Sequence, residues 1–393
     1  MGGERSALSI LNHDVYSFLG FLYTIRLTCI VHEHILYTSM TTLDELTPLD
    51  TVTLETVAVY RKLAESSRLL GEFKGVVATI PNQRILLSAL LLQEAKDSSA
   101  IENIVTTHDD LFRSAADEHL AQSPAAKEVL RYRQALDVGW SLVRHHGLLT
   151  SNHIQQIQGT LEPTRSGFRK VPGTVLKDQS GRVIYTPPQD ARAIVDLMSS
   201  LERELNEPAA SMDPLVRMAI LHHRFESIHP FYDGNGRTGR ILNVLFLLKE
   251  GLLDLPVLYL SHHIVRTKPT YYRLLQSVRE DGDWESWVLY MLTAVSESAR
   301  DGIGTVNAIR EALLTTKREL RAFPFYSQGL LNNLFTHPYT KVSFVEQDIG
   351  VTRITATKYL NALADHGMLR KIRAGRTNYY INTRLFEILT RMT

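Results

Sequence analysis

Residues 229 to 240, HPFYDGNGRTGR, gather glycines, two arginines, an aspartate and a histidine directly before the apolar run ILNVLFLLK. The run predicts a helix, and Gly234 and Gly236 at its start permit positive φ and close approach of the backbone. N–H groups at such a helix start bind anions. Arg237 and Arg240 lie three residues apart in the first turn, although the helix dipole disfavours cations there. The stretch therefore predicts a site for a polyanion.

Two further side chains of this stretch add chemistry to the anion site. Asp233 supplies a carboxylate oxygen, the kind of ligand that Mg²⁺ bound to phosphates prefers. His229 lies four residues earlier and can take a proton from an incoming hydroxyl. Phe231, between them, is expected to pin the loop to the core. Together these groups predict phosphoryl or nucleotidyl transfer; the stretch is not a P-loop, because no Lys-Ser/Thr pair follows the glycines.

The stretch resembles the signature of the Fic family, His-Pro-Phe-x-Asp/Glu-Gly-Asn-Gly-Arg-x-x-Arg, and meets every specified position. Most family members of known chemistry transfer AMP from ATP to a hydroxyl side chain of a protein. The resemblance implies that His229 is the base for a Ser, Thr or Tyr hydroxyl of the target and that Asp233 binds Mg²⁺. It also implies ATP-binding residues, the first three around the α-phosphate and the arginines on the β- and γ-phosphates: Gly234, Asn235, Gly236, Arg237 and Arg240.

Flanking segments agree with the resemblance. Residues 167–188, GFRKVPGTVLKDQSGRVIYTPP, predict a β-hairpin over residues 171 to 185, in the place where the family has a flap that aligns a target by strand addition. Tyr271 and Tyr272, after the signature, are expected to help wall the adenine. Core packing is an equally weighted alternative for each tyrosine.

A second motif, SSAIEN at residues 98–103, matches the family's inhibitory pattern Ser/Thr-x-x-x-Glu-Gly/Asn, with Ser98, Glu102 and Asn103 in register. Its position implies the class whose inhibitory helix precedes the Fic core in the same chain. Glu102 paired with Arg240 would occupy the guanidinium that the γ-phosphate needs. ATP would then bind only without its in-line geometry.

Helical spacing of apolar residues dominates the rest of the chain up to residue 300. A helix is expected to end near Gly71 and Gly75, and the next one to open at Pro81 and Asn82. Ser98 and Ser99 are expected to cap a further short helix. Other helices are predicted over 109–148, with a break at Ser123-Pro124, over 190–206 and over 213–228.

The C-terminal part, residues 330–393, predicts three helices followed by two short strands around RAGR, the plan of a winged helix-turn-helix domain. Nine Lys/Arg against four Asp/Glu leave a local excess of only +5. A DNA reader usually carries a stronger basic face. A protein-binding scaffold is therefore favoured over DNA binding through Arg353, Thr355 and Lys358.

The expected fold is mainly α: a Fic-type helical bundle with a β-hairpin flap, then a winged-helix domain. The expected domains are an N-terminal extension (1–45), N-terminal helices with the inhibitory helix (46–108), the Fic core (109–300), a helical linker (301–329) and the winged helix (330–393).

The first 40 residues lie outside the resemblance. Their uncharged run from Val15 to Ile25 is too short to span a bilayer, and no cleavage site follows, so an amphipathic extension is expected rather than a membrane anchor. Met40 is an alternative start. The single cysteine, Cys29, cannot form an internal disulfide and suits a reducing, cytoplasmic location.

Several alternatives stay open at this point. The same site could remove AMP from a modified protein, with Glu102 orienting a water, or transfer another phosphate-containing group. A DNA-binding regulator with a nucleotide-sensing core is disfavoured, because both His229 and Asp233 are kept. A transition-metal site at His222 and His223 is not expected, since adjacent helical residues point about 100° apart. Self-modification and a homodimer are compatible with the sequence.

Overall fold

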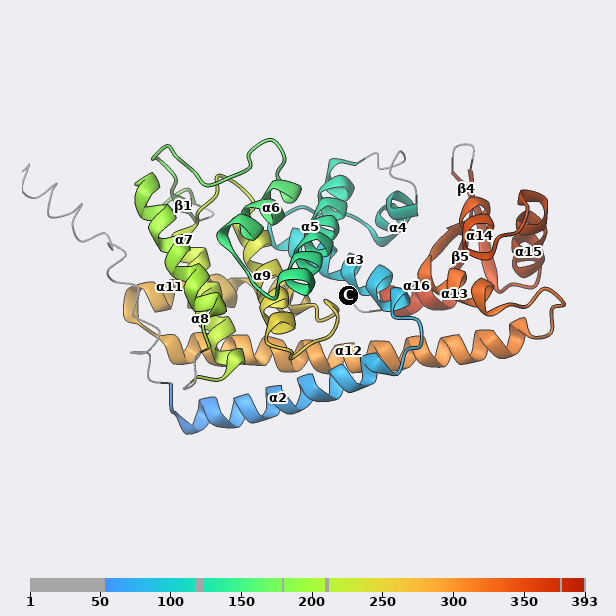
Figure 1. The fold of residues 1–393 in the computed structure, drawn as a ribbon, viewed down its shortest axis with the longest axis horizontal. Helices are drawn as coiled ribbons and strands as arrows, with labels where there is room; N and C mark the ends of the chain where they lie inside the picture. The colour runs from blue at the N-terminus through green and yellow to red at the C-terminus, as the bar shows by residue number, and fades with distance from the viewer. Residues whose placement is uncertain (1–53, 117–122, 179, 209–211, 375–376, 392–393) are drawn as a thin grey trace, which may run out of the picture. The chain divides into compact units, whose positions relative to one another are not determined.

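The computed structural model describes residues 54–116, 123–178, 180–208, 212–374 and 377–391. Most of these residues lie in helices, which confirms the mainly α prediction (Figure 1). The predictions for the N-terminal extension, for Met40 as a start and for Cys29 fall outside the described ranges. No helix within those ranges combines the length and apolar character that a membrane crossing requires.

The helices up to the end of the core begin mostly where the sequence provides a cap. The side chains of Thr56, Ser123, Asp190 and Asp213 each accept a hydrogen bond from a backbone N–H two or three residues further on. In chain order these helices are α2 (Val57–Ala78), α3 (Arg84–Ile101), α4 (His108–Ala116), α5 (Pro124–His146), α6 (Ser151–Leu161), α7 (Ala191–Asn206), α8 (Pro214–Ile228), α9 (Asn235–Lys249), α10 (Leu260–Arg266), α11 (Lys268–Asp281) and α12 (Trp284–Leu320).

Two predicted helix boundaries are wrong. Gly71 and Gly75 lie inside α2 rather than at its end, and no atom outside the helix would approach a Cβ at either position. Their cost of about 1 kcal/mol each is offset because α2 packs along α12. Ser98 and Ser99 do not cap a new helix, since α3 runs through them to Ile101. Both serines are fully buried against neighbouring elements, so tertiary contacts override their capping preference.

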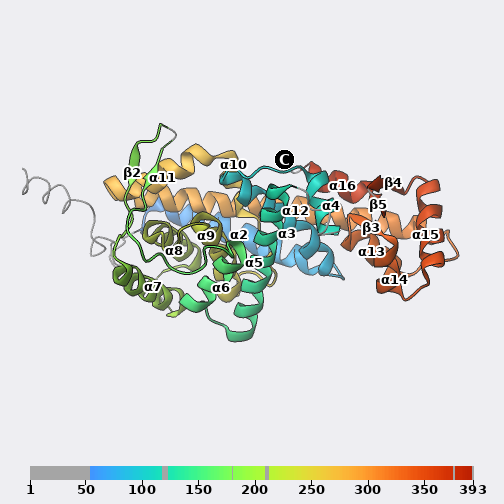
Figure 2. The same cartoon turned by 90° about the horizontal axis from the view of Figure 1, so that it is seen from above.

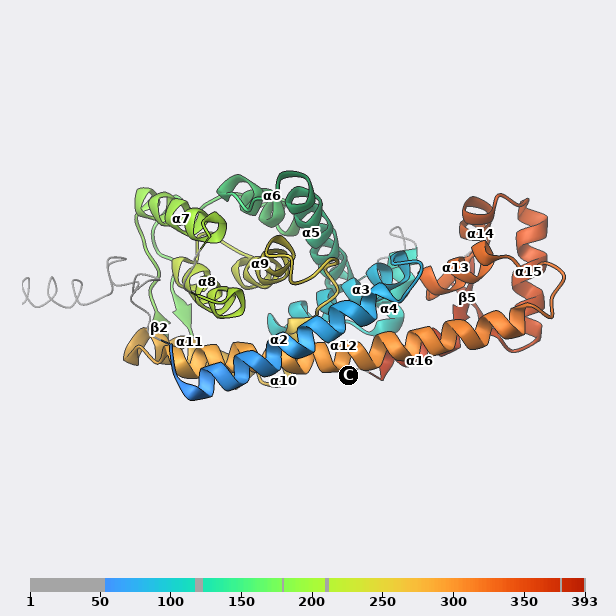
Figure 3. The same ribbon diagram turned by 60° about the horizontal axis from the view of Figure 1, so that its bottom comes forward.

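Helix α12 has 37 residues and is about 55 Å long. It lies alongside α2 and continues through the domain boundary expected between residues 300 and 301 (Figures 1 and 3). The expected linker is therefore helical to Leu320 and shares one helix with the core.

The contact between α2 and α12 leads to a stability prediction. A Cβ on Gly302 would lie 2.5 Å from the ring of Phe73, whereas a Cβ on Gly304 of the same helix would meet nothing within 4 Å. Gly302→Ala should therefore lower the free energy of unfolding by about 1 to 3 kcal/mol. Gly304→Ala should raise it by up to about 1 kcal/mol. Thermal unfolding of the two variants checks this, and equal melting temperatures would contradict the close packing.

Helices α8 and α9 form the centre of the core. Every residue of α8 from Leu215 to Ile228 is buried. α7, α12 and α2 contact α8, while α5 and α6 contact α9 (Figure 3). Gly139 of α5 permits this approach, since a Cβ there would meet Leu245 of α9 at 2.5 Å. The loop that joins α8 to α9 is thus held between two well-packed helices.

The predicted hairpin is present, with shorter strands than expected. β1 (Leu176–Lys177) pairs antiparallel with β2 (Val183–Tyr185). The turn is stabilised by Asp178, whose carboxylate accepts hydrogen bonds from the backbone N–H groups of Ser180 and Arg182.

The C-terminal module has the predicted order of helices and strands, with one strand and one helix more. It consists of α13 (Gln328–Thr336), β3 (Tyr339–Lys341), α14 (Val342–Ile349), α15 (Arg353–Asp365), β4 (Leu369–Ala374), β5 (Thr377–Asn382) and α16 (Thr383–Thr390). The strands form one antiparallel sheet in the order β3-β5-β4.

The C-terminal module contacts α3, α4 and α12 (Figure 2). The Tyr339 hydroxyl donates to Asp109 of α4, and both terminal nitrogens of Arg384 donate to Glu319 of α12 at 2.7 Å. Ile354, at the start of the helix predicted to read DNA, is 83% exposed. An exposed apolar side chain at that end favours the scaffold interpretation, which stays a prediction.

Candidate active site

The loop between α8 and α9 has the backbone conformation that its glycine-rich sequence predicts. α8 ends at Ile228, and the next residue, His229, has φ 48° and ψ 57°, a left-handed conformation that is unusual for a residue with a Cβ. Its N–H donates to the Phe225 carbonyl at 2.9 Å. Gly234 (φ 78°) precedes the first residue of α9. The start of α9 therefore faces the same loop that carries His229.

Asn235 closes this loop with its side chain. Its amide nitrogen donates to the Phe231 carbonyl at 2.8 Å, and its amide oxygen accepts from the Phe231 N–H at 2.9 Å. Phe231 is fully buried and packs on Phe168 and Phe225, so the predicted anchor role of Phe231 holds. The place of Asn235 around the α-phosphate, with the backbone of Gly234 and Gly236, stays a prediction; its side chain fixes the shape of the loop.

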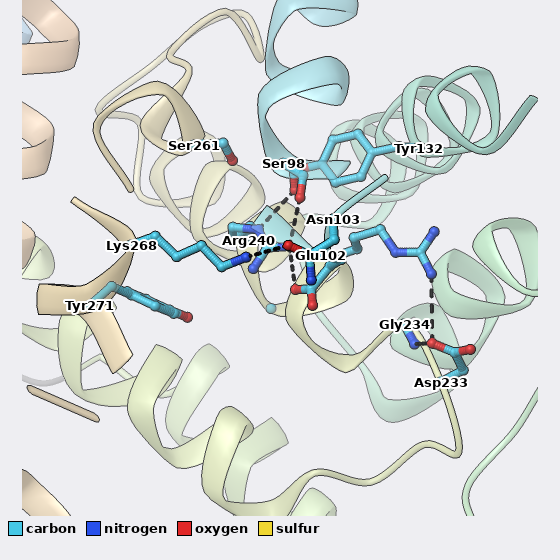
Figure 4. Close-up of polar contacts among 12 residues, drawn as sticks. Ser98, Glu102, Asn103, Tyr132, Asp233, Gly234, Arg240, Ser261, Lys268 and Tyr271 are labelled. Carbon is cyan, nitrogen blue, oxygen red and sulfur yellow. Dashed lines mark hydrogen bonds and ion pairs between the residues drawn. The ribbon is translucent and has the colours of Figure 1, made fainter. Parts of the chain in front are cut away.

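Arg240 is the centre of the site and is only 1% exposed. Its Nε donates to the Ser98 hydroxyl at 2.8 Å, and its Nη2 donates to the Ser98 carbonyl at 3.0 Å and to Glu102 Oε1 at 2.8 Å (Figure 4). Glu102 and Ser98 of the inhibitory motif lie 138 and 142 residues before Arg240 in the sequence. The fold thus brings the inhibitory motif and the signature together at one guanidinium.

The Glu102 carboxylate lies directly over the start of α9. A Cβ on Gly236 would clash with Glu102 Oε1, so only glycine leaves room for the carboxylate there. Burial works to raise the pKa of Glu102, but the charge and hydrogen bond of Arg240 outweigh it and hold the pKa below its usual value. The ion pair is therefore complete at neutral pH and is lost only as the pH falls through that lowered pKa.

The residue after Glu102 fixes the end of the inhibitory helix. Asn103 has φ 63°, and its side-chain oxygen accepts a hydrogen bond from Lys268 Nζ at 2.9 Å (Figure 4). Lys268 is the first residue of α11. The predicted motif residue Asn103 therefore ties the α3 end to the helix that carries Tyr271 and Tyr272.

Polar side chains attach α3 to its neighbours along the buried face. Glu94 accepts from the Tyr132 hydroxyl of α5 at 2.9 Å and from the Ser261 N–H of α10 at 3.1 Å. Burial nevertheless raises the pKa of Glu94 to about 7. Asp97 contacts His262 of α10 at 3.1 Å. The neighbouring His263 packs on Tyr290.

Arg237 does not point at the same place as Arg240. Its Nη2 donates to Glu162 at 2.6 Å, its Nη1 donates to Glu128 at 3.3 Å, and Asp233 lies 3.7 Å away. Three carboxylates therefore surround this guanidinium. The roles of both arginines at the β- and γ-phosphates stay predictions, and in this conformation the two guanidinium groups bond to different carboxylates.

Asp233 fits the expected Mg²⁺ ligand. Its side chain is more than half exposed, and one oxygen accepts from the Gly234 N–H at 2.7 Å, which fixes its orientation at the start of α9. Mg²⁺ that bridges phosphates needs only one or two carboxylates. Within the described ranges no group of three or more His, Cys, Asp or Glu side chains is arranged to hold a metal ion.

His229 is held as a neutral imidazole at ordinary pH. Burial lowers its pKa to about 4, and the charges of Arg169 and Arg279 act in the same direction. A neutral imidazole can accept a proton, as the predicted base must. His222 and His223 have pKa values lowered to about 3, mainly by burial, and bond to Tyr271 and to the Leu275 carbonyl. Both side chains are buried in the core.

The two tyrosines of α11 differ. Tyr271 is 1% exposed, and its hydroxyl lies 2.8 Å from His222 Nε2, so the core-packing alternative describes it. Tyr272 is 41% exposed. Only Tyr272 presents a ring face that a nucleobase could contact in this conformation.

Three residues of the site were not singled out in the sequence: Glu128, Glu162 and Arg169. Each reaches the signature from another element, Glu128 over 109 residues and Glu162 over 75. Their pairing partners could not be read from spacing. The positive charge of the two signature arginines is the feature of the sequence that indicates acidic partners nearby.

Comparison with known families agrees with this geometry. Residues 60–141 match the Fic/DOC family N-terminal model, and residues 148–247, which hold the whole signature, match the Fic/DOC family model. The chain therefore contains a Fic/DOC domain and the N-terminal segment that accompanies it. Residues 313–385 also match the C-terminal domain described as protein adenylyltransferase SoFic-like.

Relatives with similar sequences carry the name protein adenylyltransferase. The fic-1 protein of Caenorhabditis briggsae is 32% identical over 31% of this Fic chain and 23% of its own length. The Fic protein of Drosophila mojavensis is 28% identical over 50% of this chain and 42% of its own. The chain thus spans less than half the length of these relatives.

Solved structures support the fold. A Fic family protein from Desulfovibrio desulfuricans G20 aligns with a TM-score of 0.53 at 20% identity, over 83% of this chain and 96% of its own. A Fic domain protein from Bacteroides thetaiotaomicron aligns with a TM-score of 0.52 at 17% identity, over 62% of this chain and 97% of its own.

Proposed function

We propose that this Fic protein transfers AMP from Mg²⁺-ATP to a hydroxyl side chain of a protein, and that Glu102 restrains the reaction at rest. The observation that carries the proposal is the position of Glu102. Its carboxylate is paired with the buried Arg240 and lies over the start of α9. A carboxylate there occupies the place where a helix N-terminus and a guanidinium would bind a phosphate.

His229 takes the proton of the target hydroxyl in this proposal. The imidazole nitrogen accepts the proton while the hydroxyl oxygen forms a bond to the α-phosphorus. The bond from that phosphorus to the bridging oxygen of the β-phosphate breaks, and pyrophosphate leaves. A pKa of about 4 keeps His229 unprotonated before the reaction, so the imidazole is available as a base at neutral pH.

Backbone and charge at α9 stabilise the phosphates. The first N–H groups of α9 have no partner within the helix and can face an anion. Arg240 supplies the positive charge for the terminal phosphate once Glu102 has moved away. Asp233 would hold Mg²⁺, which would supply positive charge to offset that of the phosphates. Tyr272 offers the exposed ring for the adenine.

The reaction class is tested by the position of the label. ATP labelled at the α-phosphate should label protein above the level of lysate alone when the Glu102→Gly variant is added, whereas ATP labelled at the γ-phosphate should give no increase over the labelling by the lysate's own kinases. Labelling from γ-labelled ATP would show a kinase-type transfer instead and would contradict the proposal.

Asp233 provides a separate prediction about the metal. In the Glu102→Gly background, Asp233→Asn should raise the Mg²⁺ concentration for half-maximal AMP transfer by about ten-fold or more, because the phosphate-bound metal loses its protein ligand. Rates are measured across a Mg²⁺ series at fixed ATP. Asp254→Asn, at an exposed aspartate that pairs with Lys74, is the control. Identical Mg²⁺ curves for Asp233→Asn and the control would contradict the assignment.

A further inference from the structure

Arg169 approaches the catalytic loop from the segment that precedes the hairpin. It is 1% exposed, although it carries a charge. Its Nε donates to the His229 carbonyl at 2.8 Å and its Nη2 to the Ile228 carbonyl at 3.3 Å. Its own backbone N–H donates to the Pro230 carbonyl at 2.9 Å. One residue therefore bonds to three consecutive carbonyls at the point where α8 ends.

Neighbours on both sides hold the Arg169 segment in place. Phe168 and Phe231 form an isolated antiparallel bridge, and their ring centroids lie 5.4 Å apart. The Tyr232 hydroxyl accepts hydrogen bonds from the backbone N–H groups of Lys170 at 2.8 Å and Val171 at 3.1 Å. The backbone around Arg169 is thus itself hydrogen-bonded to the loop, and this fixes where the guanidinium lies.

His229 needs such support for a conformational reason. Its φ of 48° brings the Cβ close to the following carbonyl, which is unfavourable for any residue except glycine. The last carbonyls of a helix also lack partners within the helix, and an arginine side chain can satisfy them. The hydrogen bonds from Arg169 to the Ile228 and His229 carbonyls satisfy these acceptors and also hold the unfavourable backbone conformation of His229.

We propose that Arg169 is a positioning residue for the transfer reaction: its guanidinium holds the backbone of His229 in the left-handed conformation and so fixes the position of the imidazole. Arg169 acts through His229 and has no assigned contact with ATP or target. This inference rests on the function proposed above.

The charge of Arg169 gives a second, independent readout. Several charged groups act on His229. Arg169 and Arg279 of α11 lower the pKa of His229, while Glu102 at the end of α3 and the backbone of Glu226 in α8 act to raise it. Removing the Arg169 charge must therefore raise the pKa of His229. A raised pKa moves the acid limb of the pH–rate profile to higher pH, while His229 stays almost fully neutral near pH 7, so a loss of rate at neutral pH reports the position of the imidazole.

The test compares Arg169→Gln, Arg169→Lys and Arg217→Gln. Arg217 is a matched control: it is also buried, and it also donates to two carbonyls, those of Glu204 and Glu207 at the end of α7. The pKa of His229 is followed by NMR titration of the ring protons, assigned with the His229→Ala variant. AMP transfer is measured in the Glu102→Gly background as a function of pH.

Arg169→Gln should raise the pKa of His229 by about one and lower kcat/KM for the target by about 10²-fold, with the KM for ATP unchanged. Arg169→Lys should keep the low pKa of His229, because it keeps the charge. It should still lower kcat, because an ammonium cannot bond both carbonyls in the same way. Arg217→Gln should leave the pKa of His229 unchanged.

The proposal is overturned if Arg169→Gln matches Arg217→Gln in both readouts, or if kcat/KM stays unchanged while the pKa rises. A loss of kcat in either Arg169 variant beyond that of Arg217→Gln supports it. If Arg169→Gln does not fold, Arg169→Lys alone decides by kcat. The titration needs no activity, so a Glu102→Gly protein without AMP transfer would contradict the proposed function while leaving the influence of Arg169 on His229 measurable.

Discussion

Glu102→Gly is expected to raise the rate of AMP transfer by about 10²-fold or more. The wild-type carboxylate pairs with Arg240 at 2.8 Å and covers the start of α9, so a bound triphosphate cannot place its terminal phosphate on that guanidinium. A reacting phosphorus displaced by about 1 Å loses on the order of 10²-fold in rate, and removal of the side chain restores the in-line position. Initial rates of pyrophosphate release and of label transfer from α-labelled ATP measure the effect.

Glu250→Gly is the matched control for this prediction. Glu250 is also the residue that ends a helix, with φ −77° and ψ 3° against φ −89° and ψ 18° at Glu102. A glycine there changes backbone freedom at a helix end without touching Arg240, so the rate should stay at the wild-type level. Equal rates for both variants, or an unchanged rate for Glu102→Gly, would sink the autoinhibition account.

Ser98→Ala should give an intermediate rate. It removes the hydroxyl that accepts from Arg240 Nε but leaves the ion pair with Glu102.

His229→Ala is expected to lower AMP transfer by about 10³-fold when it is combined with Glu102→Gly. A positioned general base contributes about 10² to 10⁴-fold, and no other described side chain of the signature can accept the hydroxyl proton as a neutral base. The affinity for ATP, measured by calorimetry, should change little, because the residues at the start of α9 are untouched.

The exposed His145 serves as the control for the histidine substitution. His145→Ala in the same background should leave both the transfer rate and the ATP affinity unchanged. A His229→Ala variant that keeps transfer within about ten-fold of its parent would mean that another group takes the proton.

The local chemistry of the site could be predicted from sequence because it is encoded in one continuous stretch. The left-handed Gly234, the buried Phe231 and the start of α9 all follow from the order of residues in the signature. The pairing of Glu102 with Arg240 could be predicted too, because both ends lie in recognisable motifs.

The remaining features depend on distant partners. Arg237 points toward Glu128 and Glu162, which come from α5 and the end of α6, and no spacing rule connects them. Tyr271 is buried by its contact with His222, whereas its neighbour Tyr272 stays exposed. The sequence does not show which of two adjacent tyrosines on a helix is buried, because burial depends on the elements that pack against the helix.

Helix continuity was misjudged for the same reason. Ser98 favours a cap on local grounds, yet in the folded chain its hydroxyl and carbonyl both accept from Arg240, 142 residues away. The long-range contact supplies the hydrogen bonds that a cap would otherwise provide, so α3 continues to Ile101.

The most direct test of an autoinhibited AMP transferase uses α-labelled ATP, cell lysate and three proteins: wild type, Glu102→Gly, and Glu102→Gly combined with His229→Ala. The account predicts weak protein labelling by the wild type, strong labelling of discrete bands by Glu102→Gly, and none above background by the double variant. Equal labelling by the wild type and Glu102→Gly, or strong labelling by the double variant, would contradict it.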